Sequence, residues 1–108
     1  MINIKVVYNS EIKGTAMLAE TVEAVYGPRY KVELFDEKYT KEKKLGAKVK
    51  GAFGARLIPF IGVYIDKRAI KGLYEEAGEA NMSDLINFIE GSDAIRKHNE
   101  GESEEVES

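Results

Sequence analysis

The first 36 residues are patterned as a strand, a helix and a second strand, and this order restricts the possible folds more than any other feature. Residues 2–8, INIKVVY, are rich in β-branched side chains and predict a buried strand. Residues 14–26 predict a helix with one apolar stripe, formed by Met17, Leu18, Val22, Val25 and Tyr26. Residues 30–36, YKVELFD, alternate as a second strand. Two strands joined in this way run parallel, through a right-handed crossover.

The rest of the chain predicts a second helix, a hairpin and a closing helix. Residues 37–53 have a narrow apolar stripe among lysines, and two glycines that each cost about 1 kcal/mol predict a short or irregular helix. Residues 58–66 form an apolar strand opened by Pro59, and residues 69–76 pair with it as an antiparallel hairpin, with a bulge or close packing at its glycine. Ser83 is placed to cap the last helix. The order β-α-β-α-β-β-α predicts an α/β fold, a four-stranded mixed sheet with helices on both faces.

The net negative charge of the chain is concentrated in its last twelve residues. Residues 97–108 carry five glutamates against one lysine, with Val106 as their one aliphatic residue. Such a segment buries too little apolar surface to offset the entropy of ordering. We therefore expect one domain over residues 1–92 and a disordered acidic tail over residues 93–108, which either solubilises the domain or docks a partner.

Several kinds of site are excluded by residue types that are absent or rare. The chain has no cysteine, which excludes disulfides, thiolate catalysis and cysteine-bound zinc, and His98 is its one histidine. No pair of carboxylates has a spacing typical of acid–base catalysis, so we expect no catalytic residue, no metal and no cofactor. The sequence contains neither a long apolar run nor a signal-like start, which predicts a cytoplasmic protein without membrane contact.

Three segments resemble the thioredoxin-like and glutaredoxin-like superfamily. RLIPFIGVY at 56–64 looks like the segment in which a cis-proline precedes a central strand. GEANMSDLINFI at 78–89 is similar to the close of the fold, and AMLAETVEAV at 16–25 looks like the helix after the redox motif. The resemblance covers residues 2–90 and implies a thioredoxin-like fold. It places Ile12 and Thr15 where the two cysteines of Cys-x-x-Cys would stand, so the chain resembles a divergent member that lacks the motif.

The resemblance also implies where this chain would bind. The candidate binding residues are Ser10, Ile12, Lys13, Thr15, Ile58 and Pro59. Ile58 would offer its backbone to an extended peptide beside a cis Pro59. The start of the first helix would hold an anion such as glutathione, with Lys13 adding charge. The alternative for Ser10 and Thr15 is that their hydroxyls cap that helix.

A basic block lies over the second predicted helix. Its candidate surface residues are Lys41, Lys43, Lys44, Lys48, Lys50 and Arg56. These residues form a solvated helix face, a surface for a protein partner, or a nucleic-acid surface, of which the last is the weakest reading because arginines do not cluster there.

Together these features predict a redox-inactive protein-interaction or structural module, of a kind that would suit a phage or bacterial assembly. The alternatives are a glutaredoxin-like binder of an anionic small molecule or a degenerate oxidoreductase, and nucleic-acid binding through the lysines. The sequence leaves the partner and the oligomeric state open.

Overall fold

The computed structural model describes the backbone of residues 1–73 and 82–107, and the side chains of these residues up to residue 100. Its elements are β1 (Ile2–Tyr8), α1 (Lys13–Tyr26), β2 (Lys31–Asp36), α2 (Thr40–Ala52), β3 (Phe60–Ile65), β4 (Arg68–Leu73), α3 (Met82–Gly91) and α4 (Asp93–Glu107). The strands form one sheet in the order β2-β1-β3-β4. β1 and β2 are parallel, while β3 runs antiparallel to both β1 and β4. The predicted four-stranded mixed sheet is confirmed.

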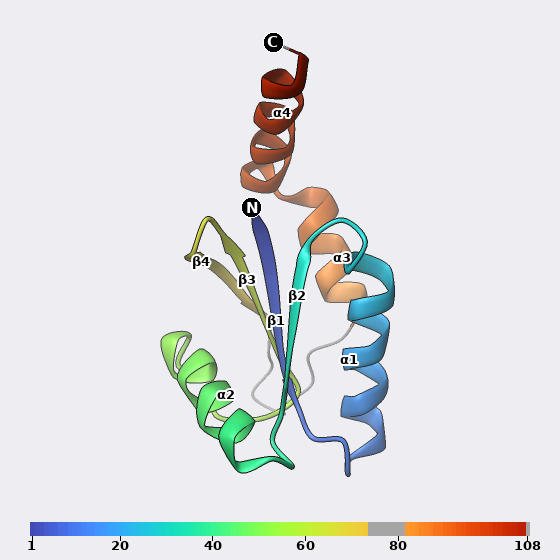
Figure 1. Ribbon diagram of the computed structural model, residues 1–108, viewed down its shortest axis with the longest axis vertical. Helices are drawn as coiled ribbons and strands as arrows, with labels where there is room; N and C mark the ends of the chain where they lie inside the picture. The colour runs from blue at the N-terminus through green and yellow to red at the C-terminus, as the bar shows by residue number, and fades with distance from the viewer. Residues whose placement is uncertain (74–81, 108) are drawn as a thin grey trace.

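Helices cover both faces of the sheet (Figure 1). α1 and α3 lie on one face and α2 lies on the other. The larger core fills the space between the sheet, α1 and α3, and includes Ile4, Val6, Val22 and Leu85, each with no exposed surface. Burial of such a side chain contributes about 1.5–3 kcal/mol. This core therefore supplies most of the apolar burial that holds the sheet to its helices.

A smaller apolar cluster lies under α2. It consists of Val7, Val49, Ala55 and Phe60, with Phe35, Phe53 and Ile58 packed against it. The consecutive strand residues Val6 and Val7 are both fully buried because helices cover both faces at this end of β1. Beyond α2 the same face of the sheet carries polar side chains, among them Lys5, Lys31 and Glu33. The ammonium groups of Lys5 and Lys31 lie 3.7 and 3.1 Å, respectively, from the Glu33 carboxylate.

The predicted buried face of α1 and the predicted irregularity of α2 both needed correction. On α1 the buried residues are Thr15, Ala19, Val22 and Tyr26, whereas Met17 and Val25 are 58% and 49% exposed. The buried face of α1 therefore includes Val22 and Tyr26 of the predicted stripe, together with the smaller Thr15 and Ala19. α2 was expected to be short or irregular, but it is a regular helix of 13 residues.

Gly46 in α2 and Gly72 in β4 are explained by close packing. A Cβ atom on Gly46 would lie 2.8 Å from Cγ1 of Val7, so glycine lets α2 contact the sheet directly. A Cβ on Gly72 would lie 2.8 Å from Cδ1 of Phe53, which confirms the close packing predicted there. The hairpin also has a register irregularity, but it lies at Val63 and Tyr64 of β3. Residues 74–76, expected to continue β4, lie outside the described residues.

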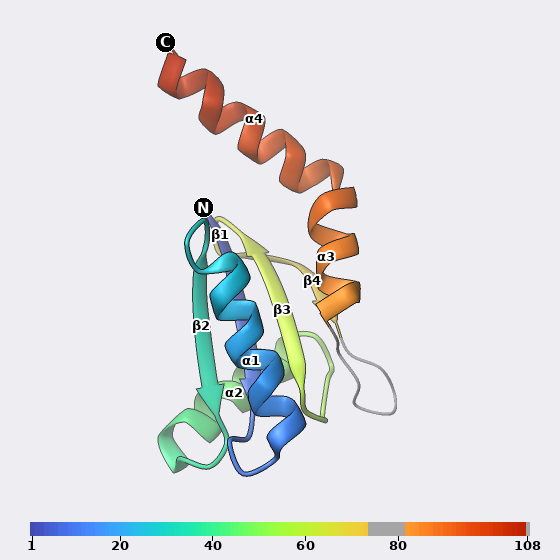
Figure 2. The ribbon, with the colours of Figure 1, turned by 90° about the vertical axis from the view of Figure 1, so that its right-hand side faces the viewer.

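Residues 93–107, expected to be disordered, form helix α4. Ile95 is 1% exposed within the larger core, and Nδ2 of Asn99 donates to the Tyr30 hydroxyl at 3.3 Å. For residues 93–100 the expectation of disorder is therefore wrong, because one buried isoleucine and its polar neighbours dock the first turns of α4 on the domain. From this anchor α4 extends away from the sheet (Figure 2). No helix among the described residues has the length and apolar character needed to span a bilayer.

Candidate functional site

Three connecting segments meet at one end of the sheet: the one after β1, the one after β2 and the one before β3. β1 and β2 run parallel, with Tyr8 beside Asp36, so both strands end there. β3 is antiparallel to β1 and begins at the same end, where Phe60 pairs with Val7. The sheet thus brings together residues 9–12 and 57–59, which lie far apart in the sequence, beside the first turn of α1 (Figure 2). We call this end of the molecule the loop end.

All six candidate binding residues belong to the loop end or to the first turn of α1. The peptide bond between Ile58 and Pro59 is cis. The side chain of Ile58 is partly buried and packs against the cluster under α2. Ile58 and Pro59 also precede the paired part of β3, which begins at Phe60.

Thr15 connects the loop after β1 to helix α1 through hydrogen bonds of its buried hydroxyl. It is 7% exposed, and its Oγ1 accepts a hydrogen bond from the Asn9 N–H at 3.1 Å. The hydroxyl lies 2.8 Å from the carbonyl oxygen of Asn9 and 2.9 Å from that of Ile12, either of which can accept its proton. The N-cap of α1 is Ile12, without a side-chain cap. The expectation that Ser10 and Thr15 cap α1 is therefore wrong, because Thr15 lies inside the helix and bonds the loop before it.

Asp36 holds the loop end from the side of β2. Its carboxylate is buried, and Oδ1 accepts hydrogen bonds from the backbone N–H groups of Ser10 and Lys38, both at 3.0 Å. Burial by itself would raise the pKa of Asp36, but the hydrogen bonds from Ser10 and Lys38 outweigh it and hold the pKa below its usual value. Asp36 is therefore an ionised structural group. The sequence placed Asp36 at the end of the second strand and gave no indication of these partners.

The solvent-facing part of the loop end carries apolar side chains and charges of both signs, because Glu11 and Lys13 are both exposed. Ile12 is 50% exposed, and Leu57, which sequence reasoning did not single out, is 51% exposed. Lys13 is exposed beside Ile12, and the first turn of α1 has no acidic residue. A leucine next to the Ile58–Pro59 bond, outside any predicted strand, was the signal that could have identified Leu57.

One of the candidate basic residues does not face solvent. Lys50 is 8% exposed, and its ammonium group donates to Glu37 Oε2 at 3.0 Å and to the Arg56 carbonyl at 3.3 Å. Lys50 therefore anchors α2 and is removed from the basic surface. The remaining candidates are exposed: Lys41, Lys43, Lys44, Lys48 and Arg56.

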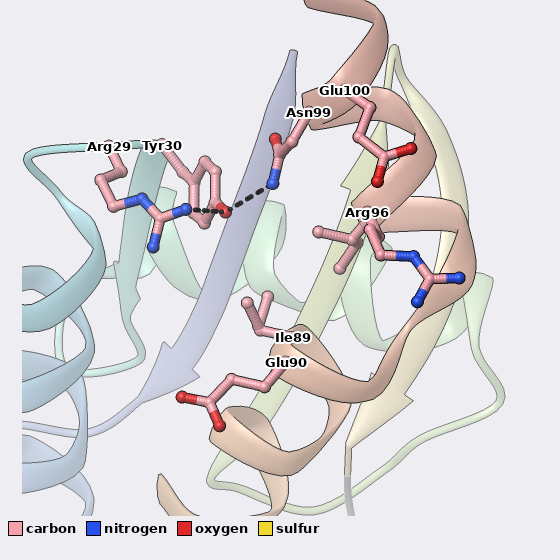
Figure 3. Close-up of a pocket in the computed structure, with 8 residues that line it drawn as sticks. Arg29, Tyr30, Ile89, Glu90, Arg96, Asn99 and Glu100 are labelled. Atoms are coloured by element: carbon pink, nitrogen blue, oxygen red, sulfur yellow. Dashed lines mark hydrogen bonds between the residues drawn. The ribbon is translucent and has the colours of Figure 1, made fainter. Parts of the chain in front are cut away.

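Two hollows in the described surface lie away from the loop end. One, of about 510 Å³, lies where α3 and α4 meet the start of β2 (Figure 3). There Arg29 and Asn99 both donate to the Tyr30 hydroxyl, at 3.1 and 3.3 Å. Another, of about 540 Å³, lies on the polar part of the sheet beside Lys5, Glu33 and other residues. Among the described residues no group of histidine, cysteine, aspartate or glutamate could hold a metal ion.

Comparisons with known proteins identify the fold. No protein family is matched by this sequence, and no curated protein gives a match. Among solved structures, the crystal structure of thioredoxin f2 from Chlamydomonas reinhardtii is similar, with a TM-score of 0.62 and 14% sequence identity. The match covers 85% of this chain and 79% of that chain.

The chain has a thioredoxin-like fold. At 14% identity the likeness establishes the fold alone, and it carries no activity across. The chain has no cysteine, so it has no Cys-x-x-Cys motif. This protein therefore has the thioredoxin-like fold without the Cys-x-x-Cys motif.

Proposed function

We propose that this protein is a redox-inactive, thioredoxin-like interaction module that binds a protein partner at the loop end. The observation that carries the proposal is the pair of half-exposed apolar side chains there: Ile12 follows β1 and Leu57 precedes β3, and these two strands are neighbours in the sheet. Such side chains gain free energy when a partner removes them from water, at about 25 cal/mol per Å² of apolar surface.

The chemistry of the chain supports binding over catalysis. Thiol–disulfide exchange requires a thiolate that attacks a sulfur, and this chain contains no cysteine. Ile12, at the position that the resemblance gives to the nucleophile, has no reactive group. The hydroxyl of Thr15 is buried in hydrogen bonds to Asn9 and Ile12, and no histidine lies in the segment that holds it.

The backbone at the loop end supports an extended partner. Ile58 and Pro59 lie just before the paired part of β3, where an added strand would continue the sheet. The hydrogen bonds of Asp36 and Thr15 fix the neighbouring loop, so it needs little ordering when a partner binds. An extended peptide with an apolar side chain directed at Ile12 or Leu57 would fit this arrangement.

The test is affinity capture from the native source with three versions of the full chain. The wild type and Val25→Ser, an exposed apolar position near the other end of α1, should retain the same enriched protein. The double variant Ile12→Ser/Leu57→Ser should lose it at least tenfold, measured by quantitative mass spectrometry. Equal capture by all three versions, or no protein enriched over a blank resin, would contradict the proposal.

The anion-binding alternative rests on one observation. The first turn of α1 has neither a side-chain cap nor an acidic residue. The N–H of Thr15 donates to the Ile12 carbonyl, which leaves the N–H groups of Lys13 and Gly14 for an anion. A thermal-shift series with glutathione and similar anions tests it. A shift that Lys13→Ala reduces would favour a small anionic ligand over a protein partner. Nucleic-acid binding through the lysines stays a prediction, with one fewer lysine to carry it.

A further inference from the structure

The outward side of α2 is a row of unpaired cations. Lys41, Lys44 and Lys48, which we call the lysine face, follow the i, i+3, i+7 spacing and lie opposite the buried residues of the helix. All three are exposed, and within the described part of the chain no carboxylate forms an ion pair with them. Like charges at this spacing repel one another, so the lysine face gains free energy when an anionic surface covers it.

The opposite charge is concentrated in one other helix. From Glu100 onward α4 carries five glutamates and neither lysine nor arginine; we call residues 100–107 the acidic half of α4. The first half of α4 is docked on the domain through the buried Ile95 and through Asn99. Figure 3 shows Asn99 beside Tyr30. The acidic half continues beyond this anchor, away from the sheet (Figure 2).

Within one copy these two surfaces lie at opposite ends of the molecule. α2 lies beside the lower half of the sheet and α4 leaves from the upper end in both views (Figures 1 and 2). The molecule is 47 Å along its longest axis, several times the screening length of about 8 Å at physiological salt. The acidic half of α4 therefore cannot neutralise the lysine face of its own chain.

We propose that the lysine face of α2 binds the acidic half of α4 of a second copy of this chain. Two copies in antiparallel alignment satisfy both surfaces at once and form a closed pair with two equivalent contacts. Leu45, which is 42% exposed and follows Lys44 in the helix, adds apolar area to the contact. This proposal does not rest on the proposed function, which concerns the loop end.

Ionic strength gives the first test, by light scattering of the full chain after size exclusion. Exposed ion pairs each strengthen association only roughly 1.4- to 5-fold, so the pair should form at low salt and high protein concentration. The mass of the wild type should exceed that of the monomer in about 20 mM salt and return to it in about 500 mM salt, where charges are screened within a few ångströms. A monomeric mass in both buffers would overturn the proposal.

Charge reversal tests the location of the contact. Lys41→Glu/Lys44→Glu/Lys48→Glu should be monomeric at low salt, because its helix face repels the glutamates. The matched control, Lys67→Glu/Arg68→Glu/Lys71→Glu, makes the same change in net charge on the exposed side chains of the β3–β4 hairpin and should associate like the wild type. Equal loss of association in the control would show that net charge alone decides the mass, which contradicts a specific contact.

A mixing experiment separates the proposed contact from a loss of folding. Glu102→Lys/Glu104→Lys/Glu105→Lys should also be monomeric by itself at low salt. An equimolar mixture of this variant with the lysine-face variant restores one attractive contact of each polarity, so the mixture should recover the mass of the wild-type pair. A mixture that stays monomeric, or a lysine face that binds a generic DNA duplex while the wild type remains monomeric, would overturn the proposal.

Discussion

α2 and α4 are both rich in charged residues, yet they are attached to the domain in different ways. α2 places Gly46, Val49 and Lys50 in buried positions along its length, over a separate apolar cluster. α4 buries Ile95 in its first turn and adds the hydrogen bond between Asn99 and Tyr30. A helix that is mostly charged can thus belong to the core or extend from it, depending on how many of its turns reach the sheet.

This difference predicts different kinds of failure. Loss of an α2 anchor should lower the stability of the whole domain, because α2 covers the strand β1 at the centre of the sheet. Loss of an α4 anchor should release α4 while the sheet stays folded, as local unfolding of a peripheral element. The predictions that follow test this contrast, from the largest expected effect to the smallest.

Lys50→Ala should lower the free energy of unfolding by about 3 kcal/mol, because it leaves the Glu37 carboxylate largely buried without its cation. Urea denaturation followed by circular dichroism measures the change. Lys48→Ala, an exposed lysine of the same helix, is the control and should stay within about 0.5 kcal/mol of the wild type. Equal effects of the two substitutions would show that Lys50 is not an anchor.

Ile95→Ala should weaken the docking of α4 by about 2 kcal/mol, at the lower end for an isoleucine truncated in a core, because the site lies at the edge of the domain. Hydrogen exchange should speed up at the amides of α4 and stay unchanged in β1. Arg96→Ala, at an exposed neighbouring position, is the control. Faster exchange in β1 and α4 alike would place α4 in the cooperative core and remove the contrast with α2.

Asp36→Asn should cost about 1.5 kcal/mol near pH 7, because neutral asparagine accepts weaker hydrogen bonds from Ser10 and Lys38. The pKa of Asp36 is lowered in the folded state from 3.8, so the stability from its ionised form is present above about pH 4 and is lost as the pH falls through the folded-state pKa. The two proteins should differ at pH 7, and the difference should shrink as the pH falls below about 4. A constant difference over this range would contradict the role of the charge.

The two glycines of α2 should respond in opposite directions to alanine. Gly51→Ala should stabilise the protein by up to about 1 kcal/mol, because nothing lies within 4 Å of the added Cβ. Gly46→Ala should destabilise it by about 1 kcal/mol, because the new Cβ meets Val7 at 2.8 Å and the overpacking exceeds the gain in helix propensity. Thermal unfolding of both variants compares them directly, and a stabilised Gly46→Ala would mean that α2 is not closely packed.

Much of the candidate site could be predicted from the sequence because it follows from strand order. Once residues 2–8 and 58–66 were assigned as strands, the loop after the first and the proline before the second had to meet at one end of the sheet. The partners of Asp36 and Lys50 could not be predicted in this way. The contact of Asp36 with Ser10 depends on how the loop after β1 folds, and the contact of Lys50 with Glu37 depends on how α2 packs. Leu57 was missed because exposure of an apolar residue in a loop has no periodicity to mark it.

By itself, the sequence determined the order of the elements from β1 to α3, the sheet and the absence of a cysteine at the start of α1, because β-branched runs, helical stripes and residue types are local properties. Only the tertiary structure decided which face of α1 is buried, that Lys50 points inward, and that α4 docks through Ile95. These depend on contacts between residues far apart in the chain. The same packing directs the lysine face and the acidic half of α4 to opposite ends, so a second copy is needed to bring them together.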